Sequence, residues 1–401
     1  NENFATTDKH TAAPDSLNAS FNTASNHQLK NLIVLKDYIV DPFNGIADLH
    51  HQFLRHVGPA FAEDPVRILR LARFAARYTN FVVAPETMHL MQEMVHNGEV
   101  NALVAERVWQ ELAKGLTQAK PSLMMKVLHD CGALKVLLAP WDHLWQHPFE
   151  LNLAFHLIDG CGQQLQALHQ GLLNQEPSDN SYPSTKPTKP ISHTNQGLVN
   201  TNTFVQLIQW VAKNNTSSDV HQDAKHYDLS IYFCCFCLAC LYPNLHLAVS
   251  KDTIKPFSLT QFNEIKSISV SLKVPVDCRD LAHFTCRELP HILAIRFLDS
   301  HEILDLLERL DAFRKPQRLI NVLLCADQFF QQLLVQNPLL PADWGLARLA
   351  QAFVICQNVD TFQVAKQAQA SGLKGLEIGL EIKKVRQKSL FLNLFEKSNL
   401  A

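Results

Sequence analysis

Glycine is scarce in this sequence, and the scarcity excludes several classes of protein. Only 13 of the 401 residues are glycine, less than half of the usual share of about 7%. No G-x-G-x-x-G and no G-x-x-x-x-G-K-[ST] pattern occurs, so neither a dinucleotide-binding turn nor a P-loop is available to cradle phosphates. Collagen-like repeats and turn-dense β-sandwiches are disfavoured for the same reason.

Long apolar runs and a large net charge are missing as well. The longest mostly apolar stretch spans residues 229–241, whereas a membrane-spanning helix needs about 20 apolar residues. The first residue is Asn, and no basic-then-apolar leader is visible. We therefore expect a cytoplasmic protein without a membrane partner. Lys and Arg number 36 against 38 Asp and Glu, a net charge of −2, so a nucleic-acid surface would have to be a local basic face.

The ten cysteines lie mostly in apolar segments with helical spacing, which is typical of reduced thiols rather than disulfides. Four of them cluster at 234–240 and include a C-x-x-C. A zinc site needs four converging ligands, but helical spacing would scatter these thiols around the axis of an apolar helix. The sequence therefore favours a buried helix here, and it predicts no metal site.

The hydrophobic pattern is helical along most of the chain. No segment beyond residue 46 has the alternation of a strand, so we predict an all-α fold with a short β remnant near residues 31–40. The predicted regions are a disordered polar lead at 1–29, a strand and turn at 30–46, a helical region at 47–140, a second at 141–310 with a disordered insertion at 174–202, and a helical tail at 311–401.

The most informative segment spans residues 63–77. Asp64 and Pro65 predict the start of a helix, with Asp64 as its cap and Pro65 as its first residue. The arginines that follow fall within an arc of about 120° at 100° per residue, opposite a largely apolar face. The basic face consists of Arg67, Arg70, Arg73 and Arg77, and the apolar face contains Ile68, Leu71, Ala72 and Ala75.

Two interpretations of this segment stay open from the residues alone. In the first, Asp64 only caps the helix and the arginines form a solvated face. In the second, Asp64 accepts a hydrogen bond from the amino group of a nucleobase while an arginine donates to a ring nitrogen. Such an edge would read adenine or cytosine and would reject uracil and guanine, which carry a carbonyl in place of the amino group.

Several segments resemble bacterial CCA-adding tRNA nucleotidyltransferases. The resemblance rests on DPFNG at 41–45, on LRHVGPAFAEDPVRILRLARFAARY at 54–78, and on AERVWQE at 105–111. Shorter matches are LHDCGAL at 128–134, AFRKPQR at 312–318 and SGLKGLEI at 371–378. The resemblance implies addition of CCA to the 3′ end of tRNA from CTP and ATP with Mg²⁺, and a tRNA acceptor arm as partner. It also makes residues 47–140 the neck of such an enzyme.

The same resemblance assigns roles to residues of this chain. Asp64 and Arg67 would select the base, and Arg70 would also contact the nucleotide. Residues that would support this template are Glu63, Glu106, Arg107 and Glu111. Candidates for RNA contact are Arg73, Arg77, Arg314, Lys315, Arg318, Lys383, Lys384 and Arg386.

Two parts of the family pattern are missing. The family holds Mg²⁺ with paired carboxylates in a head upstream of the turn at 41–45, and no such pair is found here. We therefore expect a fragment that lacks the catalytic head, contains no catalytic residue, and is inactive alone. The multifunctional subfamily also has a phosphohydrolase domain with an adjacent His-Asp pair, where this chain has Leu238 and Ala239. His156 matches that domain's first histidine but Leu289 replaces a later one, so we expect a degenerate domain.

Two other functions remain possible at this point. A poly(A) polymerase-like RNA nucleotidyltransferase shares the EDPVR motif at 63–67, although the flanking GPAFA at 58–62 favours CCA addition. A non-catalytic helical RNA-binding protein would keep the basic face without the enzyme.

Overall fold

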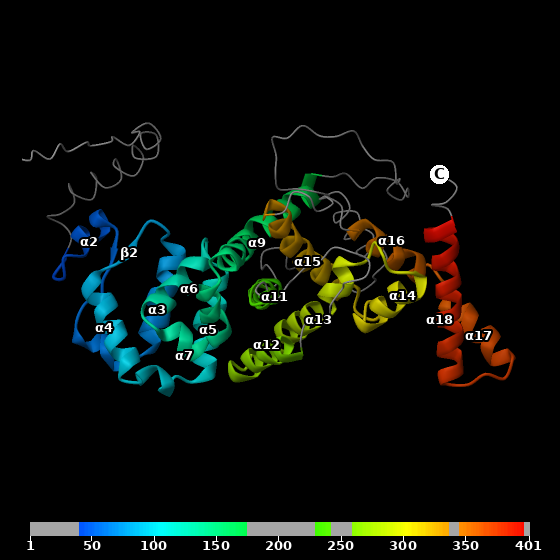
Figure 1. Cartoon of the computed structure of the whole chain (residues 1–401), viewed down its shortest axis with the longest axis horizontal. Coiled ribbons are helices and arrows are strands. Elements are labelled where there is room, and N and C mark those ends of the chain that lie inside the picture. The colour runs from blue at the N-terminus through cyan, green and yellow to red at the C-terminus, as the bar shows by residue number, and fades with distance from the viewer. Residues whose placement is uncertain (1–39, 175–228, 242–258, 337–344, 397–401) are drawn as a thin grey trace, which may run out of the picture.

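The computed structural model describes residues 40–174, 229–241, 259–336 and 345–396. These residues form an elongated array of helices, with α2 (Gly45–His51) near one end and the pair α17 (Thr361–Ala370) and α18 (Leu376–Leu390) at the other (Figure 1). The prediction of an all-α fold is confirmed. The predicted lead at 1–29 lies outside the described residues. So do the β remnant at 31–40, except for residue 40, and the insertion at 174–202, except for residue 174.

The first twelve described elements span residues 45–146. They are α2, the short strand β1 (Phe53–Leu54), the 3-10 helix η2 (Pro59–Glu63), α3 (Val66–Arg77), β2 (Val82–Val83), α4 (Pro85–His96), η3 (Glu99–Ala102), α5 (Ala105–Leu116), α6 (Pro121–Asp130), α7 (Ala133–Leu137), α8 (Ala139–His143) and η4 (Leu144–Gln146). Helix α3 packs against both α5 and α6. Its apolar face is fully used in that packing, because Ile68, Leu71, Ala72 and Ala75 are all buried, as the sequence predicts.

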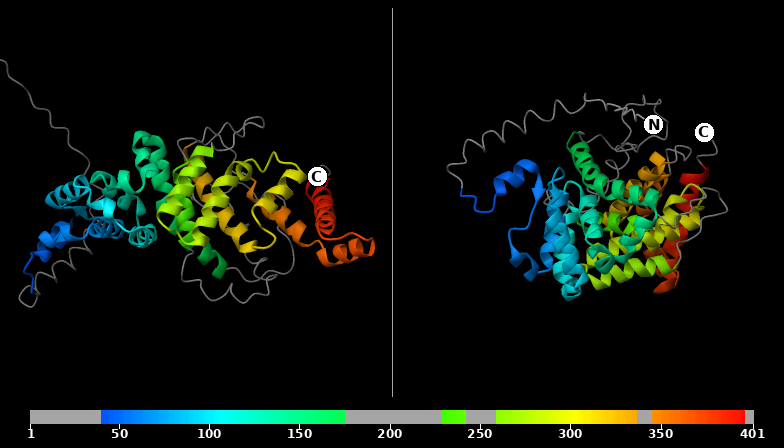
Figure 2. Two further views of the ribbon diagram at one scale, coloured as in Figure 1. Left: turned by 90° about the horizontal axis from the view of Figure 1, so that it is seen from below. Right: turned by 60° about the vertical axis from the view of Figure 1, so that its left-hand side comes forward.

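The remaining helices continue the array toward the C-terminus (Figure 2). They are α9 (Pro148–Asn174), α11 (Leu229–Ala239), α12 (Leu259–Ser271), α13 (Val276–Leu293), α14 (Ser300–Arg309), α15 (Pro316–Gln336), α16 (Leu346–Gln357), α17, α18 and the π-helical turn η7 (Phe391–Glu396). Within the residues described, no helix is both long and apolar enough to cross a membrane.

The turn at 41–45 forms as its sequence predicts. The Asp41 carboxylate accepts hydrogen bonds from the backbone N–H groups of Gly45 at 2.7 Å and Ile46 at 2.9 Å. Asn44 adopts the left-handed conformation, with φ of 58°, which asparagine tolerates better than most residues. Asp41 thereby satisfies backbone donors that would otherwise be unpaired at the start of α2.

The expectation that no strand follows residue 46 is wrong in one place. β1 and β2 pair in parallel, with Phe53 opposite Val82 and Leu54 opposite Val83. Each strand has only two residues, so neither can show the alternation from which a strand is recognised in a sequence. The pairing places the chain on either side of α3 next to each other and so fixes both ends of that helix.

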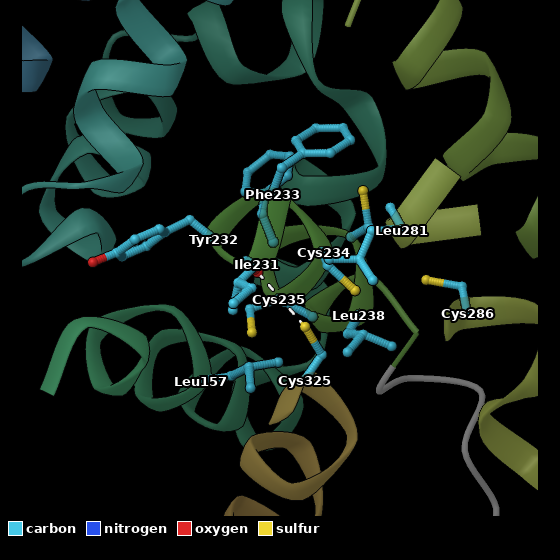
Figure 3. Close-up of a cluster of buried hydrophobic side chains, with 14 of the residues drawn as sticks. Leu157, Ile231, Tyr232, Phe233, Cys234, Cys235, Leu238, Leu281, Cys286 and Cys325 are labelled. Carbon is cyan, nitrogen blue, oxygen red and sulfur yellow. Dashed lines mark hydrogen bonds between the residues drawn. The ribbon is translucent and has the colours of Figure 1, made fainter. Parts of the chain in front are cut away.

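Helix α11 forms the centre of the core in the middle of the molecule. Every residue from 230 to 239 is buried, and the helix packs against α5, α9, α13 and α15. Cys234 and Cys235 point into this apolar surrounding (Figure 3), and Cys237 is completely buried as well, so the predicted buried helix is confirmed. The core also joins the first two helical regions, because the Trp141 Nε1–H donates to the Phe236 carbonyl oxygen at 3.1 Å and Trp109 packs edge-on against Phe233.

Candidate nucleotide and RNA interface around helix α3

The N-terminal end of α3 is organised by Asp64. The helix begins at Val66, one residue later than predicted, and Pro65 precedes it. Asp64 nevertheless acts at this helix end, because its Oδ1 accepts a hydrogen bond from the Val66 N–H at 3.1 Å. The 3-10 helix η2 ends at Glu63, directly before Asp64, and Glu63 itself is exposed. The carboxylate of Asp64 is thus held between two helical segments.

Arg107 holds the other oxygen of this carboxylate. Its Nη2 donates to the Asp64 Oδ2 at 2.8 Å, across 43 residues of sequence. This hydrogen bond is the main reason that the pKa of Asp64 lies below its ordinary value, and the Val66 N–H and the charge of Arg67 act in the same direction against the opposing effect of burial. The side chain remains 27% exposed. An ionised carboxylate offers about four acceptor positions, so Asp64 can still accept a hydrogen bond from a ligand.

Arg67 lies one turn along α3 from Asp64 and is half-buried. Its charge lowers the pKa of Asp64, but no ion pair or side-chain hydrogen bond joins its guanidinium to the residues that the structure describes. A fixed acceptor and an uncommitted set of donors therefore lie side by side. Together they can bind a planar group that presents a donor next to an acceptor.

Glu111 organises the rest of the basic face from α5. Its side chain is only 7% exposed and its Oε2 accepts from the Arg73 Nε at 2.8 Å. The Nε of Arg70 and the Nζ of Lys114 lie at 3.7 Å from its other oxygen. Arg73 is therefore largely committed to the protein, with 18% of its side chain exposed. Arg70 is about half exposed and more loosely held, and Arg77 is exposed at the end of the helix.

Glu106 contacts a different part of the molecule. Its Oε1 accepts from the Lys273 Nζ at 2.5 Å, and that hydrogen bond lowers the pKa of Glu106. Lys273 lies in the left-handed conformation just after α12. Of the predicted support residues, Arg107 and Glu111 thus touch the Asp64 and arginine groups directly, whereas Glu106 ties α5 to the middle of the chain.

The predicted RNA contacts in the tail differ in how accessible they are. Arg314 and Lys315 are exposed, although Arg314 lies 3.3 Å from Asp311. Arg318 is largely buried against Phe284 and pairs with Asp311. The tail therefore presents two of these side chains to solvent and uses the third internally.

The basic residues of α18 divide in the same way. Lys383 donates to Asp305 at 2.6 Å and Glu308 at 2.7 Å, which raises the pKa of Lys383. Arg386 lies over the ring of Phe313 at 3.8 Å, and burial lowers its pKa. Lys384 and Lys388 are exposed, and Lys384 pairs with Glu381 on its own helix.

The residues that we expect at the position of the family's His-Asp pair lie in the core. Leu238 and Ala239 are both completely buried in α11, and Leu289 is equally buried in α13. Across the described ranges, no group of three or more His, Cys, Asp or Glu side chains is arranged to hold a metal ion. The donor set therefore does not fit Mg²⁺, and no catalytic step through a metal can be assigned to the residues described.

A cavity that the sequence analysis did not identify lies between α9, α15 and the segment directly before α6. Its volume is about 440 Å³, and its polar lining includes Lys120, His156, Asp159 and Gln332. The Asp159 carboxylate accepts from the Ser122 N–H at 2.8 Å and from the Ser122 hydroxyl at 2.6 Å. The lining residues come from three separate elements, so no local motif could have indicated this cavity.

Comparison with known proteins identifies the family. Residues 80–142 match a sequence family described as a probable RNA and SrmB-binding site of polymerase A. The chain is 35% identical over 357 residues to the multifunctional CCA protein of Acidovorax sp. (strain JS42), an alignment that covers 88% of this chain and 70% of the relative. It is 37% identical over 362 residues to the protein of the same name from Variovorax paradoxus (strain S110), covering 88% and 71%.

Solved structures give more distant likenesses. A Thermotoga maritima CCA-adding enzyme in complex with tRNA aligns over 90% of this chain and 65% of its own, with a TM-score of 0.44 and 14% identity. A CCA-adding enzyme with CTP aligns over 90% and 64%, with a TM-score of 0.43 and 14% identity. This chain thus spans about 70% of the two curated relatives and less than two thirds of these two solved chains. On the identity to the curated relatives, the chain belongs to the family of multifunctional CCA proteins.

Proposed function

We propose that the protein adds CCA to the 3′ end of tRNA from CTP and ATP, and that this chain supplies the base-selecting edge and part of the tRNA-binding surface. The observation that carries the proposal is the group formed by Asp64, Arg107 and Arg67, within a chain 35% identical to a multifunctional CCA protein. The family resemblance also implies a cytoplasmic location. It implies Mg²⁺ as well, bound by a head that we propose lies upstream of Asn1.

The proposed selection follows from hydrogen-bonding chemistry. Cytosine and adenine each present an amino donor beside a ring-nitrogen acceptor, whereas uracil and guanine present a carbonyl beside an N–H. Asp64 can only accept while it is ionised, and Arg67 can only donate. Cytosine and adenine therefore satisfy both side chains, and uracil and guanine leave both unsatisfied. Arg107 acts on selection indirectly, because its hydrogen bond lowers the pKa of Asp64 and fixes one of the carboxylate oxygens.

The proposed tRNA surface is the exposed part of the basic groups. Arg77 continues the α3 face beyond the base-selecting edge, and Arg70 is positioned between them. Arg314 and Lys315 offer a second contact in the tail. Side chains of this kind bind phosphates and fix the position of an RNA without reading its sequence. We assign Arg73, Arg318, Lys383 and Arg386 to the internal stability of the protein, since each is engaged within it.

Extension of a tRNA that lacks its 3′ end tests this function. The complete protein, with the proposed head, should incorporate C twice and then A, while residues 1–401 alone should incorporate nothing. Incorporation of labelled CTP by residues 1–401 alone would contradict the proposed division between head and chain. Failure of the complete protein to extend such a tRNA would contradict the proposed function itself.

A poly(A) polymerase-like activity is the second candidate, favoured by the match of residues 80–142 to a family described for polymerase A. It predicts repeated A addition to RNA that is not tRNA, with no use of CTP. The same extension assay separates the two, because only CCA addition requires C before A. A complete protein that binds RNA and extends nothing would instead be a non-catalytic RNA-binding protein.

A further inference from the structure

Two histidines at the junction of α8 and α9 have their side chains directed at each other. His143 is the last residue of α8, and His147 lies between η4 and α9. Their Nε2 atoms are 3.3 Å apart, and their ring centres are 5.0 Å apart with an angle of 66° between the ring planes. Two imidazoles that met head-on across this gap would have their centres further apart. Both rings are therefore inclined to the line that joins the two nitrogens.

The separation of the two nitrogens matches that of two ligands on one metal ion. Zinc binds histidine nitrogen at about 2.0–2.1 Å in tetrahedral geometry, which places two such nitrogens about 3.3–3.4 Å apart. Neighbouring ligands at right angles, as in square-planar and octahedral complexes, would be only about 2.9 Å apart. Inclined rings are also what a shared ion requires, because its bonds to the two nitrogens meet at an angle.

The backbone that carries this pair is held by its neighbours. Trp141 and Leu144, on either side of His143, are buried. The His147 N–H donates to the Leu144 carbonyl oxygen at 2.9 Å, and the His147 carbonyl oxygen accepts from the Leu151 N–H at 2.9 Å. Little backbone freedom would be lost when an ion binds, and such preorganisation favours binding.

The pair differs from a histidine that has a structural partner. The Nδ1 of His129 lies 2.8 Å from the Asp142 Oδ1, so a carboxylate fixes that ring. Among the described residues, neither His143 nor His147 forms an ion pair with a carboxylate, and each has the other imidazole as its side-chain partner. Glu150, in the first turn of α9, adds a negative charge three residues after His147, which favours a cation there.

We propose that His143 and His147 form a binding site for Zn²⁺, a property that does not depend on the proposed function. Neutral imidazole is a preferred ligand of zinc, copper and nickel, and the 3.3 Å separation selects tetrahedral zinc among them. The described ranges bring no third metal-binding side chain to this pair, so water supplies the remaining ligands. The bound ion joins the end of α8 to the start of α9.

Zinc titration of residues 1–401, prepared without an affinity tag, tests the proposal. Isothermal titration calorimetry should show one more zinc ion per wild-type chain than per chain of the variant His143→Ala/His147→Ala. Each single alanine variant should already resemble the double variant, with a dissociation constant raised at least about tenfold, because one imidazole alone cannot chelate. Circular dichroism confirms that each variant keeps its helices.

Two further variants separate chelation from general effects of losing a histidine. His147→Cys should keep zinc binding, since a thiolate is also a zinc ligand. His89→Ala, which removes an exposed histidine paired with Glu93 on α4, should leave the dissociation constant unchanged.

Cobalt substitution tests the geometry. Co²⁺ in place of Zn²⁺ should give the strong visible absorption of a tetrahedral complex, and the double alanine variant should lack it. Only the weak absorption of an octahedral complex would contradict the tetrahedral assignment. Equal zinc uptake by wild type and the double variant would overturn the proposal. Additive losses in the two single variants would do the same, because they would indicate two independent histidines.

Discussion

Removal of the Glu111 side chain should lower the free energy of unfolding more than removal of the Arg107 side chain, which pairs with Asp64. In the Glu111→Ala variant, Arg73 loses its 2.8 Å acceptor while only 18% of its side chain is exposed. Breaking a buried ion pair by deleting one partner costs about 3–5 kcal/mol. Arg73 keeps some access to water and lies over the ring of Phe74, so we expect a loss of about 2–3 kcal/mol.

Two matched variants give the scale of this effect. Glu111→Gln keeps an oxygen acceptor for Arg73 and loses only the charge, so it should cost about 1 kcal/mol. Arg107→Ala removes an ion pair whose side chains are 47% and 27% exposed, and such pairs contribute about 0–1 kcal/mol. The order of destabilisation should therefore be Glu111→Ala, then Glu111→Gln, then Arg107→Ala.

Urea unfolding followed by circular dichroism measures this order, and hydrogen exchange of peptides from α3 and α5 locates the effect. A double-mutant cycle with Arg73→Ala isolates the pair, because residues in direct contact do not give additive losses. The Glu111→Ala/Arg73→Ala variant should be at least about 1 kcal/mol more stable than the sum of the single losses. Additive losses, or a Glu111→Ala variant as stable as Arg107→Ala, would refute the reasoning.

Three further predictions concern the core and the middle of the chain. Trp141→Phe should destabilise by about 1–2 kcal/mol in urea unfolding, because the Phe236 carbonyl loses its donor; an unchanged midpoint would contradict this. Burial raises the pKa of the Cys131 thiol to about 11 and that of Cys356 to about 12, so both should resist iodoacetamide at pH 8 until the protein is unfolded; rapid native-state labelling would count against it. Added Ni²⁺ or Mn²⁺ should produce no phosphatase or cyclic phosphodiesterase activity, and turnover that is lost on chelation would show that the middle region retains its hydrolase.

The buried and basic faces of α3 could be predicted from the sequence, because the helical repeat alone decides which residues share a face. The arginines of 67–77 and the apolar residues between them separate into two faces at 100° per residue, and burial in the structure follows that separation. The identity of the residue that holds Asp64 could not be predicted from spacing. Arg107 lies 43 residues away, and Lys273 lies 167 residues from its partner Glu106.

The exposure of the basic side chains could not be predicted from the sequence either. A cluster such as Lys383, Lys384 and Arg386 indicates an RNA contact when it is read alone. In the structure two carboxylates of α14 bind Lys383, and an aromatic ring covers Arg386. Which carboxylate or ring lies beside a lysine or arginine depends on how distant helices pack, and no local pattern encodes that.

Base selection by Asp64 and Arg67 is the central claim, and single-nucleotide incorporation with all four NTPs tests it most directly. In the complete protein, Asp64→Ser keeps a capping oxygen for the start of α3 but removes the ionised acceptor for the base. Loss of a charged partner that leaves the other unsatisfied costs about 1–3 kcal/mol or more. We therefore expect C and A incorporation to fall by about five- to 150-fold and U and G incorporation to rise relative to them, with little change in melting temperature. An Asp64→Ser protein that is stable, fully active and still selective for C and A would contradict the account.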